Sequence, residues 1–298
     1  MNEKTLISII IPVFNEKESI PLLYKRLRNV IDSLNKKYEF EILFTNNCST
    51  DSTLETIQKL RTEDPRIEVI TFSRNFGHEV SIRAGIEHAN GSLLITMDGD
   101  GEDPPELIKE FVKYWENGYE IVYGERSPGN LKFFRKLFYR ITSLIADHDF
   151  ILDMADFNLI TSDVRDVIIQ NRSTYPFTRT DVAYAGFKRK AIPYQRQNRL
   201  AGINTGSSSI LKMAMYAMGG ILSSSTFPLR LAAYIGFPLI IVDIILLMYR
   251  DLFVLVLINS VYVILFIIFI SIYLARVYND IMHRPMYIID WRHSSIEQ

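Results

Sequence analysis

Short apolar runs alternate with amphipathic stretches through the first third of the chain. Four runs rich in β-branched residues predict buried strands, at residues 6–12, 41–45, 67–72 and 92–97. Three stretches between them carry apolar residues at helical spacing, at residues 19–34, 52–61 and 79–88. Because regular alternation of strand and helix is typical of the α/β class, we expect a mainly parallel sheet covered by helices.

Polar residues follow the ends of these predicted strands. They are Asn15, Glu16, Asn46, Asn47, Arg74, Asn75, Asp98 and Asp100. The carboxyl ends of parallel strands meet at one edge of a sheet, and that edge is the usual ligand site of an α/β fold. We therefore expect these side chains to lie together and to form a binding site.

The densest polar cluster is an acidic loop between the strand at 92–97 and a predicted helix start at 103–106. Asp98, Asp100 and Glu102 recur at every second residue, so their carboxylates share one face of an extended chain. Hard oxygen ligands suit Mg²⁺ or Mn²⁺, which we expect here as the cofactor. An acidic, solvated turn is the alternative interpretation. No glycine-rich phosphate-binding motif occurs in the sequence, so a nucleoside diphosphate would bind through the cation.

Two long apolar runs dominate the last third of the chain, Leu231–Tyr249 and Leu252–Ala275. Each is long enough to cross a bilayer, which takes about 20 residues per helix. Only Arg250 and Asp251 separate the runs, so they predict a tight transmembrane hairpin. Basic residues flank the hairpin at Arg230, Arg276, His283, Arg284 and Arg292. Since positive flanks stay cytoplasmic, we expect a multi-pass protein of the cell (inner) membrane whose termini and globular domain face the cytoplasm.

An acid lies inside the first apolar run. Asp243 is costly in a bilayer unless it has a polar partner. Asn259 lies at a similar depth in the second run, because both residues are about equally far from the connecting turn. We expect Asp243 to be protonated or hydrogen-bonded, either to Asn259 or to a neighbouring subunit of a homo-oligomer.

Two further segments are amphipathic. Residues 132–146 place apolar side chains on one helical face with basic side chains beside it, which favours a helix on an anionic membrane surface over a core helix with a basic edge. The expected parts of the chain are a globular domain at 1–206 that includes this interfacial helix, an amphipathic juxtamembrane segment at 207–229, the hairpin at 230–276 and a cytoplasmic tail at 277–298.

Composition limits the partners and the cellular compartment that suit this protein. The net charge is −1, so no global field favours nucleic acid as a partner. The single cysteine, Cys48, excludes an intrachain disulfide and suits a reducing compartment. The first apolar run is short and broken by Pro12, so we expect no signal peptide.

Several motifs together resemble one known family. They are Ile11–Glu16, Ser73–His78, Ala84–Gly85, Ala89–Gly91 and Met97–Asp100 followed by Asp103–Glu106. In this order they resemble the inverting GT-A glycosyltransferases of family 2, and within them the polyprenyl-phosphate branch that includes dolichyl-phosphate mannose synthase and bactoprenol glucosyltransferase. The resemblance implies a Rossmann-like GT-A catalytic domain, followed here by interfacial helices and two transmembrane helices.

The resemblance also implies roles for the polar residues at the sheet edge. The nucleotide would be bound by Pro12, Phe14, Asn15, Glu16, Asn46, Asn47, Asn75, Asp98 and Gly99. The metal and the diphosphate would be held by Asp98, Asp100 and Glu102. Two positions depart from the family, because Asn46–Asn47 replaces two aspartates and Gly101–Glu102 replaces leucine and glutamine. The first departure leaves the nucleobase open, and the second adds a negative charge beside the metal.

Catalytic and acceptor residues are implied by two further motifs. Met154–Ile160 resembles the family's D-F-R-L segment, which makes Asp156 an active-site carboxylate and puts Asn158 at the usual arginine. A lipid phosphate has a second pKa of about 6, so Asp156 would orient a group rather than remove a proton. A capping or ion-pair role for Asp156 is the alternative. Arg196 and Arg199 lie in a segment that resembles the family's R-x-x-R-x-x-G motif, and Arg126 lies at the end of a predicted strand. We expect all three arginines to bind phosphate.

These expectations combine into one function. The chain would be a metal-dependent enzyme that moves a sugar, with inversion, from a nucleoside diphosphate sugar to a polyprenyl phosphate at the cytoplasmic membrane face. A UDP-sugar is the favoured donor, and the nucleotide sugar, the lipid and the membrane are the expected partners. Two alternatives stay open: a lipid alcohol or polysaccharide acceptor, and a non-catalytic membrane scaffold whose nucleotide site has decayed.

Overall fold

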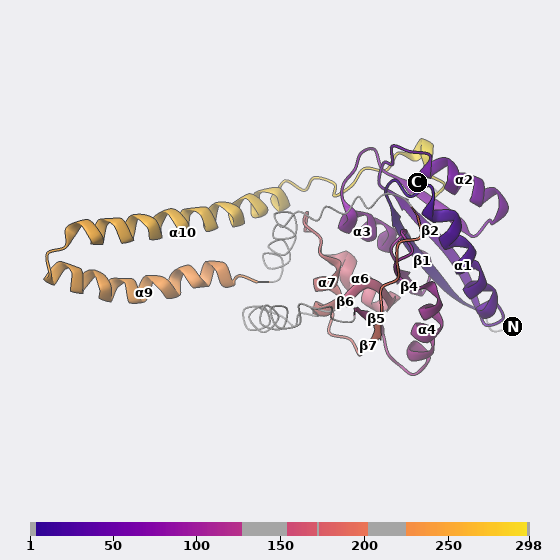
Figure 1. Ribbon diagram of the computed structural model, residues 1–298, viewed down its shortest axis with the longest axis horizontal. Helices are drawn as coiled ribbons and strands as arrows, with labels where there is room; N and C mark the ends of the chain where they lie inside the picture. Colours follow the sequence, from indigo (N-terminus) through magenta and orange to yellow (C-terminus); the bar gives the residue numbers. More distant parts are fainter. Residues whose placement is uncertain (1–3, 127–153, 172, 202–224, 297–298) are drawn as a thin grey trace.

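The computed structural model describes residues 4–126, 154–171, 173–201 and 225–296. The predicted interfacial helix at 132–146 and most of the predicted juxtamembrane segment at 207–229 lie outside the described residues. Figure 1 shows a globular domain from which a long helical hairpin projects.

A mixed sheet forms the centre of the globular domain. Its seven strands in the described residues are β1 (Thr5–Val13), β2 (Tyr38–Asn46), β3 (Ile67–Thr71), β4 (Leu93–Thr96), β5 (Ile121–Arg126), β6 (Met154–Thr161) and β7 (Arg189–Tyr194). They lie in the order β3-β2-β1-β4-β6-β5-β7. Among these strands β6 runs antiparallel to β4 and β5, and the other neighbours are parallel, so the predicted mainly parallel sheet is confirmed.

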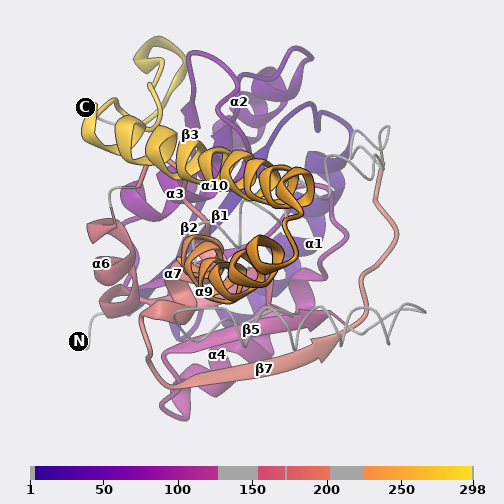
Figure 2. The ribbon, with the colours of Figure 1, turned by 90° about the vertical axis from the view of Figure 1, so that its left-hand side faces the viewer.

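Helices cover both faces of the sheet, as Figures 1 and 2 show. Those of the described globular domain are α1 (Ser19–Leu34), α2 (Thr53–Glu63), α3 (His78–His88), the 3₁₀ turn η1 (Pro105–Leu107), α4 (Ile108–Glu116), α6 (Ser162–Gln170) and α7 (Thr178–Tyr184). The core beneath α1, α2 and α4 contains Ile7, Ile9 and Ile11 of β1, whereas Ile10 belongs to the core beneath α3, α6 and α7. A strand buried on both faces is continuously apolar, which is why the sequence predicts β1 well.

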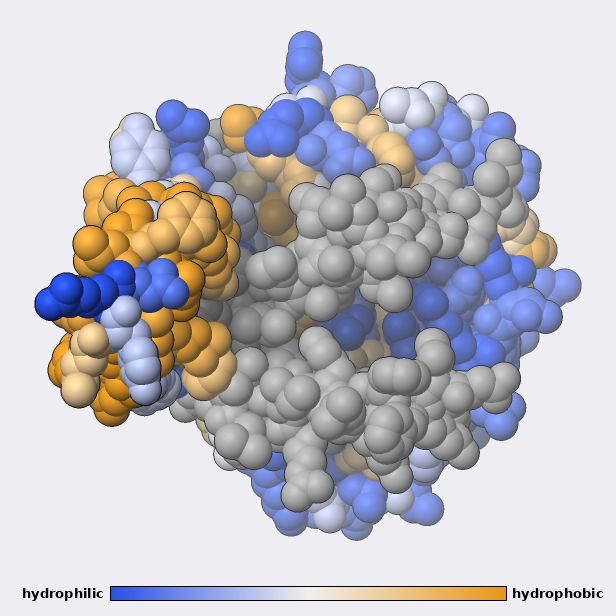
Figure 3. Space-filling view, turned by 60° about the vertical axis from the view of Figure 1, so that its left-hand side comes forward, coloured by the Kyte–Doolittle hydropathy of each residue, from blue (hydrophilic) through white to orange (hydrophobic). Residues whose placement is uncertain are grey.

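The hairpin consists of α9 (Phe227–Met248) and α10 (Leu252–Ile281). Arg250 lies in the turn between them with a left-handed backbone, at φ 58°. Both helices are long and apolar enough to cross a membrane, judged by length and composition. Figure 3 shows apolar side chains over most of the visible surface of the hairpin. α10 continues to Ile281, beyond the predicted end of the second span and into the segment predicted as a tail.

The polar pair predicted inside the hairpin is present. Asn259 Nδ2 donates to Asp243 Oδ1 at 2.7 Å and to the Leu255 carbonyl at 3.0 Å. Asp243 therefore has a hydrogen-bond partner within the same chain, as one of the two expected arrangements requires.

We expect Asn259→Leu to destabilise the hairpin by about 0.6–1.7 kcal/mol, because the Asp243 carboxyl then loses its donor in an apolar environment. The double variant Asp243→Leu/Asn259→Leu should recover most of the loss, since both polar groups are then absent. Thermal unfolding in detergent micelles, followed by circular dichroism, measures both effects. A double variant no more stable than Asn259→Leu would contradict this account of the pair.

The end of α10 is attached to the globular domain through the loop before α7. Asp280 Oδ1 accepts from the Thr174 N–H at 2.8 Å and from the Thr174 hydroxyl at 2.7 Å. Asn279 Nδ2 donates to the Tyr175 hydroxyl at 2.6 Å, and Arg276 Cζ lies 4.9 Å from the centroid of the Tyr175 ring. These contacts hold the C-terminal end of the hairpin beside α7.

Residues 287–296, which we call the strap, return from α10 to the outer strand β3 and include the 3₁₀ turn η2 (Trp291–His293). The Ser295 N–H donates to the Val69 carbonyl at 2.9 Å. The Ser294 and Ser295 hydroxyls accept from the N–H groups of Thr71 and Val69 at 2.9 and 2.8 Å. The strap therefore covers an edge strand that would otherwise be open to pairing, and this part of the predicted tail packs on the globular domain.

The double variant Ser294→Ala/Ser295→Ala should lower the free energy of unfolding by about 1–3 kcal/mol, because two N–H groups of the edge strand lose their acceptors. Urea unfolding followed by tryptophan fluorescence measures the change. Ser92→Ala, at an exposed serine away from the strap, serves as the control. Equal stability of the double variant and the control would show that the strap contributes nothing here.

Candidate active site

A cavity of about 460 Å³ opens at the carboxyl ends of β1, β2 and β4. The predicted site residues that line it are Pro12, Phe14, Glu16, Asn47, Asn75, Asp98, Gly99, Asp100, Glu102, Arg196 and Arg199. Val13, Gly77, His78 and Ser81 complete the lining, and no site role was predicted for these four. The sheet edge thus gathers most of the predicted site residues around one cavity.

Two of the predicted nucleotide-binding residues lie outside this lining and support loops instead. Asn15 has a left-handed backbone, at φ 59°, and its Oδ1 accepts from the Thr50 N–H at 2.8 Å. Asn46 is buried, and its Oδ1 accepts from the Ser49 N–H at 3.1 Å. Both side chains fix the loop that follows β2.

Two glycines shape the acidic loop. Gly99 lies so close to β1 that a Cβ atom there would come within 2.8 Å of the Val13 side chain. Gly101 has a φ of +75°, which favours glycine and accounts for this residue where the family has leucine. The Asp100 carboxylate accepts from the Glu102 N–H at 3.0 Å and closes the turn. The loop therefore keeps its acids beside the cavity.

Arg196 lies among the three predicted metal ligands. Its Nη2 is 3.3 Å from Asp98 Oδ2 and 3.9 Å from Asp100 Oδ2, and its Nε forms an ion pair with Glu102. Within the described ranges, no three His, Cys, Asp or Glu side chains converge as a metal site. Arg196 instead contacts all three of these acids. In donor type, the three carboxylates suit Mg²⁺ or Mn²⁺, although they do not converge on one point in this structure.

The other two predicted phosphate-binding arginines also pair with acids of the site. Arg199 Nη1 lies 3.8 Å from Asp100 Oδ2, and Arg199 forms a further ion pair with Glu16. Arg126, at the end of β5, has its Nη2 3.8 Å from Asp98 Oδ2. All three arginines thus lie within reach of a phosphate group at the acidic loop.

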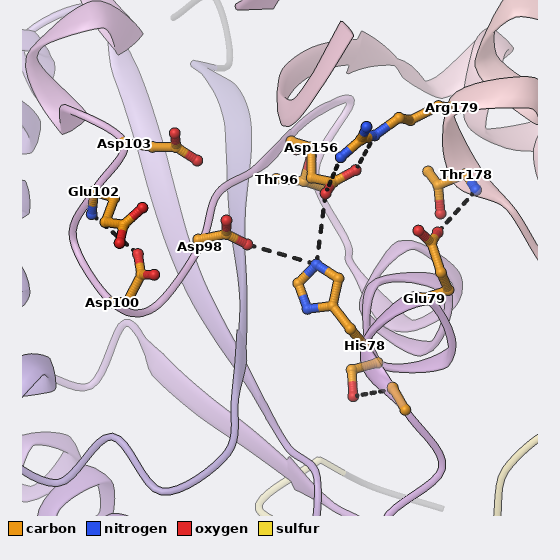
Figure 4. Close-up of polar contacts among 12 residues, drawn as sticks. His78, Glu79, Thr96, Asp98, Asp100, Glu102, Asp103, Asp156, Thr178 and Arg179 are labelled. Atoms are coloured by element: carbon orange, nitrogen blue, oxygen red, sulfur yellow. Dashed lines mark hydrogen bonds and ion pairs between the residues drawn. The ribbon is translucent and has the colours of Figure 1, made fainter. Parts of the chain in front are cut away.

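A charged network joins the acidic loop to α7, as Figure 4 shows. His78, the first residue of α3, has its Nε2 3.5 Å from Asp98 Oδ1 and 3.7 Å from Asp156 Oδ2. Arg179 on α7 donates two hydrogen bonds to Asp156, from Nε to Oδ1 at 2.8 Å and from Nη2 to Oδ2 at 2.7 Å. Asp156 therefore has the ion pair that was expected as its alternative role, and it lies next to the cavity.

Sequence reasoning assigned no role to His78 or Arg179. His78 ends the motif Ser73–His78, so its segment stood out although its side chain did not. Arg179 belongs to no motif. No local pattern in the sequence marks Arg179 as the partner of Asp156.

Burial and neighbouring charges set the protonation of this network. Burial raises the pKa of the Asp156 carboxyl, but the Arg179 guanidinium outweighs burial and holds that pKa well below its usual range. Burial lowers the pKa of His78, but contact with Asp156 and Asp98 outweighs it and raises the pKa to about 9. Burial raises the pKa of Asp98, which the charge of His78 offsets only in part. Asp156 is therefore ionised, and His78 cationic, at neutral pH.

Comparison with known proteins assigns the family. Residues 8–193 match glycosyl transferase family 2. The chain is 36% identical over 302 residues to the uncharacterized glycosyltransferase YkcC of Bacillus subtilis, covering 95% of this chain and 92% of the relative. It is 33% identical over 309 residues to bactoprenol glucosyl transferase of Shigella phage SfV, covering 95% of this chain and 97% of that protein.

A solved structure shares the fold. Mannosyl-3-phosphoglycerate synthase from Rubrobacter xylanophilus superposes with a TM-score of 0.51 and 13% sequence identity, covering 74% of this chain and 73% of that chain. The predicted architecture is confirmed as a GT-A-like domain followed by two apolar C-terminal helices. The chain belongs to glycosyl transferase family 2 and is a glycosyltransferase.

Proposed function

We propose that this glycosyltransferase moves a sugar from a nucleoside diphosphate sugar to a polyprenyl phosphate at the cytoplasmic face of the membrane. A UDP-sugar is the favoured donor. Relatives named bactoprenol glucosyl transferase match most of the chain and support a lipid-linked acceptor. The two apolar helices, with basic residues on both flanks, support the membrane location and the cytoplasmic orientation.

The nucleoside of the donor would occupy the part of the cavity beside β1. Glu16 has a buried carboxylate oxygen, Oε2, without a hydrogen-bond partner in the described part of the chain. That oxygen can accept a hydrogen bond from a ribose hydroxyl. Pro12 and Phe14 supply an apolar wall against which a base can lie.

The diphosphate would lie at the acidic loop. Arg196 and Arg199 line this part of the cavity and carry the charge to bind phosphate oxygens. Asp98, Asp100 and Glu102 would hold Mg²⁺ or Mn²⁺, which would supply positive charge against the leaving diphosphate. In the structure Arg196 pairs with Asp98 and Arg199 with Asp100, so nearby arginines offset the negative charge of the acidic loop.

The state of Asp156 is the observation that favours a phosphate acceptor. Its pKa is held low by Arg179, so it is a poor proton acceptor at neutral pH. An alcohol acceptor needs a base, whereas a lipid phosphate with a second pKa of about 6 is already largely a dianion. An ionised, arginine-bound Asp156 therefore suits positioning of the reactants rather than removal of a proton.

A short series of contacts connects the site with the hairpin. Arg179 on α7 holds Asp156 beside the cavity, and the loop directly before α7 contacts the end of α10 through Thr174 and Asp280. α7 lies on the side of the domain that faces the hairpin (Figure 1). This arrangement supports a route for a lipid headgroup from the membrane surface to the donor.

In the proposed step, a phosphate oxygen of the lipid attacks the anomeric carbon of the sugar, and the bond from that carbon to the diphosphate breaks. The configuration at the carbon inverts, which gives a β-linked polyprenyl phosphate sugar and a free nucleoside diphosphate. The arginines and Asp156 hold the reactants in line and neutralise their charge.

The test uses the full-length protein in vesicles that contain undecaprenyl phosphate, supplied with a panel of labelled UDP- and GDP-sugars. We expect label to enter the lipid phase from one of these donors. Asp156→Asn should slow transfer to the lipid phosphate, whereas it should abolish transfer to a lipid alcohol, which needs a base. Label that stays water-soluble with every donor would contradict the proposal.

A further inference from the structure

We propose that Asn47 is a positioning residue whose side-chain amide locks the loop 75–77, directly before α3, against the end of β2. The inference rests on the proposed function only for the identity of the ligand, a nucleoside diphosphate. The loop matters because Asn75, Gly77 and the adjacent His78 line the cavity, as Asn47 itself does. The lock thus shapes the wall of the cavity that a bound nucleotide meets.

Four hydrogen bonds make up the lock. The Phe76 N–H donates to Asn47 Oδ1 at 2.8 Å, and the Gly77 N–H donates to Asn75 Oδ1 at 2.9 Å. Asn47 Nδ2 donates to the same Asn75 Oδ1 at 3.0 Å. The Asn47 N–H donates to the Val13 carbonyl at 2.9 Å. These bonds join the ends of β1 and β2 to the loop before α3.

The orientation of both amides follows from their backbone partners. A backbone N–H can only donate, so the Asn47 atom that faces the Phe76 N–H must be the oxygen. For the same reason the Asn75 atom that faces the Gly77 N–H must be the oxygen. Asn47 Nδ2 then points at an acceptor, and this position needs a side chain that both donates and accepts.

Aspartate has opposite effects at the two positions. At position 47 the second oxygen of an aspartate would face Asn75 Oδ1, so two hydrogen-bond acceptors would repel each other. Turning the Asn75 amide would bring its nitrogen against the Gly77 N–H, donor against donor. At position 75 an aspartate keeps both bonds, because that side chain is needed only as an acceptor.

This role differs from the one implied by the family resemblance, in which two aspartates at 46 and 47 would contact base or ribose. Both ends of the Asn47 amide are engaged within the protein, and the Asn46 oxygen accepts from Ser49. The side chains of the two asparagines therefore hold neighbouring loops in place. If residue 47 contacted the base or ribose directly, as in the family, Asn47→Asp should bind the nucleotide more tightly than wild type. If Asn47 forms the lock, Asn47→Asp should bind the nucleotide more weakly.

Calorimetric titration of the full-length protein with UDP and Mn²⁺ compares Asn47→Asp, Asn75→Ala and Asn75→Asp. The first two break the lock, and we expect each to bind UDP at least about 10-fold more weakly than Asn75→Asp does. Asn47→Asp and Asn75→Asp add the same charge to the same cavity, so comparing these two variants reduces the influence of the added charge itself. Equal affinities, or Asn47→Asp tighter than wild type, would overturn the lock.

Backbone hydrogen exchange tests the lock without a ligand. We expect the Phe76 and Gly77 N–H groups to exchange about 10-fold faster in Asn47→Asp than in wild type or Asn75→Asp, with β1 and β4 unchanged. Unchanged exchange at both groups would overturn the lock, whatever the affinity. A wild-type protein that binds neither UDP nor GDP would count against the proposed function. The exchange result would still show whether Asn47 holds the loop in place.

Transfer kinetics separate positioning from a general loss of folded protein. In the vesicle assay Asn47→Asp should raise the KM for the nucleotide sugar about 10-fold and leave the KM for the lipid unchanged. A variant that is merely less folded would lower kcat with both KM values unchanged, and that outcome would overturn the proposal.

Discussion

Replacing Asp100 by asparagine should lower kcat/KM for sugar transfer about 100- to 1,000-fold. Asparagine keeps the shape of the side chain and can still accept from the Glu102 N–H, so the loop should hold. It removes the negative charge that the divalent cation and the nearby Arg196 and Arg199 would share. Initial rates of lipid labelling in vesicles at a fixed Mn²⁺ concentration measure the loss.

Asp166→Asn is the matched control for this experiment, because Asp166 is an exposed carboxylate on α6 away from the cavity. The control should keep wild-type rates. Binding of Asp100→Asn to vesicles should also match wild type, since the change lies in the donor site. A loss for Asp100→Asn below 10-fold, or an equal loss in the control, would contradict the role given to the acidic loop.

Replacing Arg179 by alanine should lower kcat about 100-fold, because Asp156 then loses the two hydrogen bonds that orient it and a displacement of about 1 Å costs that much. The affinity for UDP should change little, since Arg179 does not line the nucleotide cavity. Transfer rates at saturating donor, together with calorimetric titration of UDP, separate the two effects.

Arg28→Ala removes an exposed arginine from α1 and serves as the control. Its kcat should equal that of wild type. If Arg179→Ala retained wild-type kcat, Asp156 would not depend on α7, and the link from the hairpin to the active site would lose its support.

The first four strands and their helices follow from the sequence because burial on both faces leaves long apolar runs. The helix predicted at 19–34 has the same bounds as α1, and the strands β2 and β3 differ from their predictions by a few residues. The position of the site also follows from the sequence, since the carboxyl ends of parallel strands lie along one edge of the sheet. The acidic loop, Asn47 and Asn75 therefore lie at one cavity, as expected, whereas Asn15 and Asn46 lie outside its lining.

Elements held by distant contacts were harder to predict. β7 is a short, basic stretch without regular alternation of exposed and buried residues, and its position is set by pairing with β5. The strap lies in the segment predicted as a tail, yet its serine hydroxyls and main chain pair with β3. Neither feature has a local pattern that specifies its partner.

The pairing of charges in the site could not be predicted for a similar reason. The resemblance to the family assigns Arg196 and Arg199 to phosphate binding, but it does not tell which carboxylate each one meets. Arg179 reaches Asp156 from a different helix, and no motif marks it. Such pairs depend on how α7 packs on the sheet, which is set by the whole domain.

We infer that acids at the sheet edge hold a divalent cation and, through it, a nucleoside diphosphate. Binding of UDP to the full-length protein in Mn²⁺ and in EDTA, for wild type and for Asp98→Asn, tests this claim most directly. We expect wild type to bind UDP in Mn²⁺ at least about 10-fold more tightly than in EDTA, and Asp98→Asn to lose most of that difference. Equal affinity of wild type for UDP with and without the metal would contradict the claim.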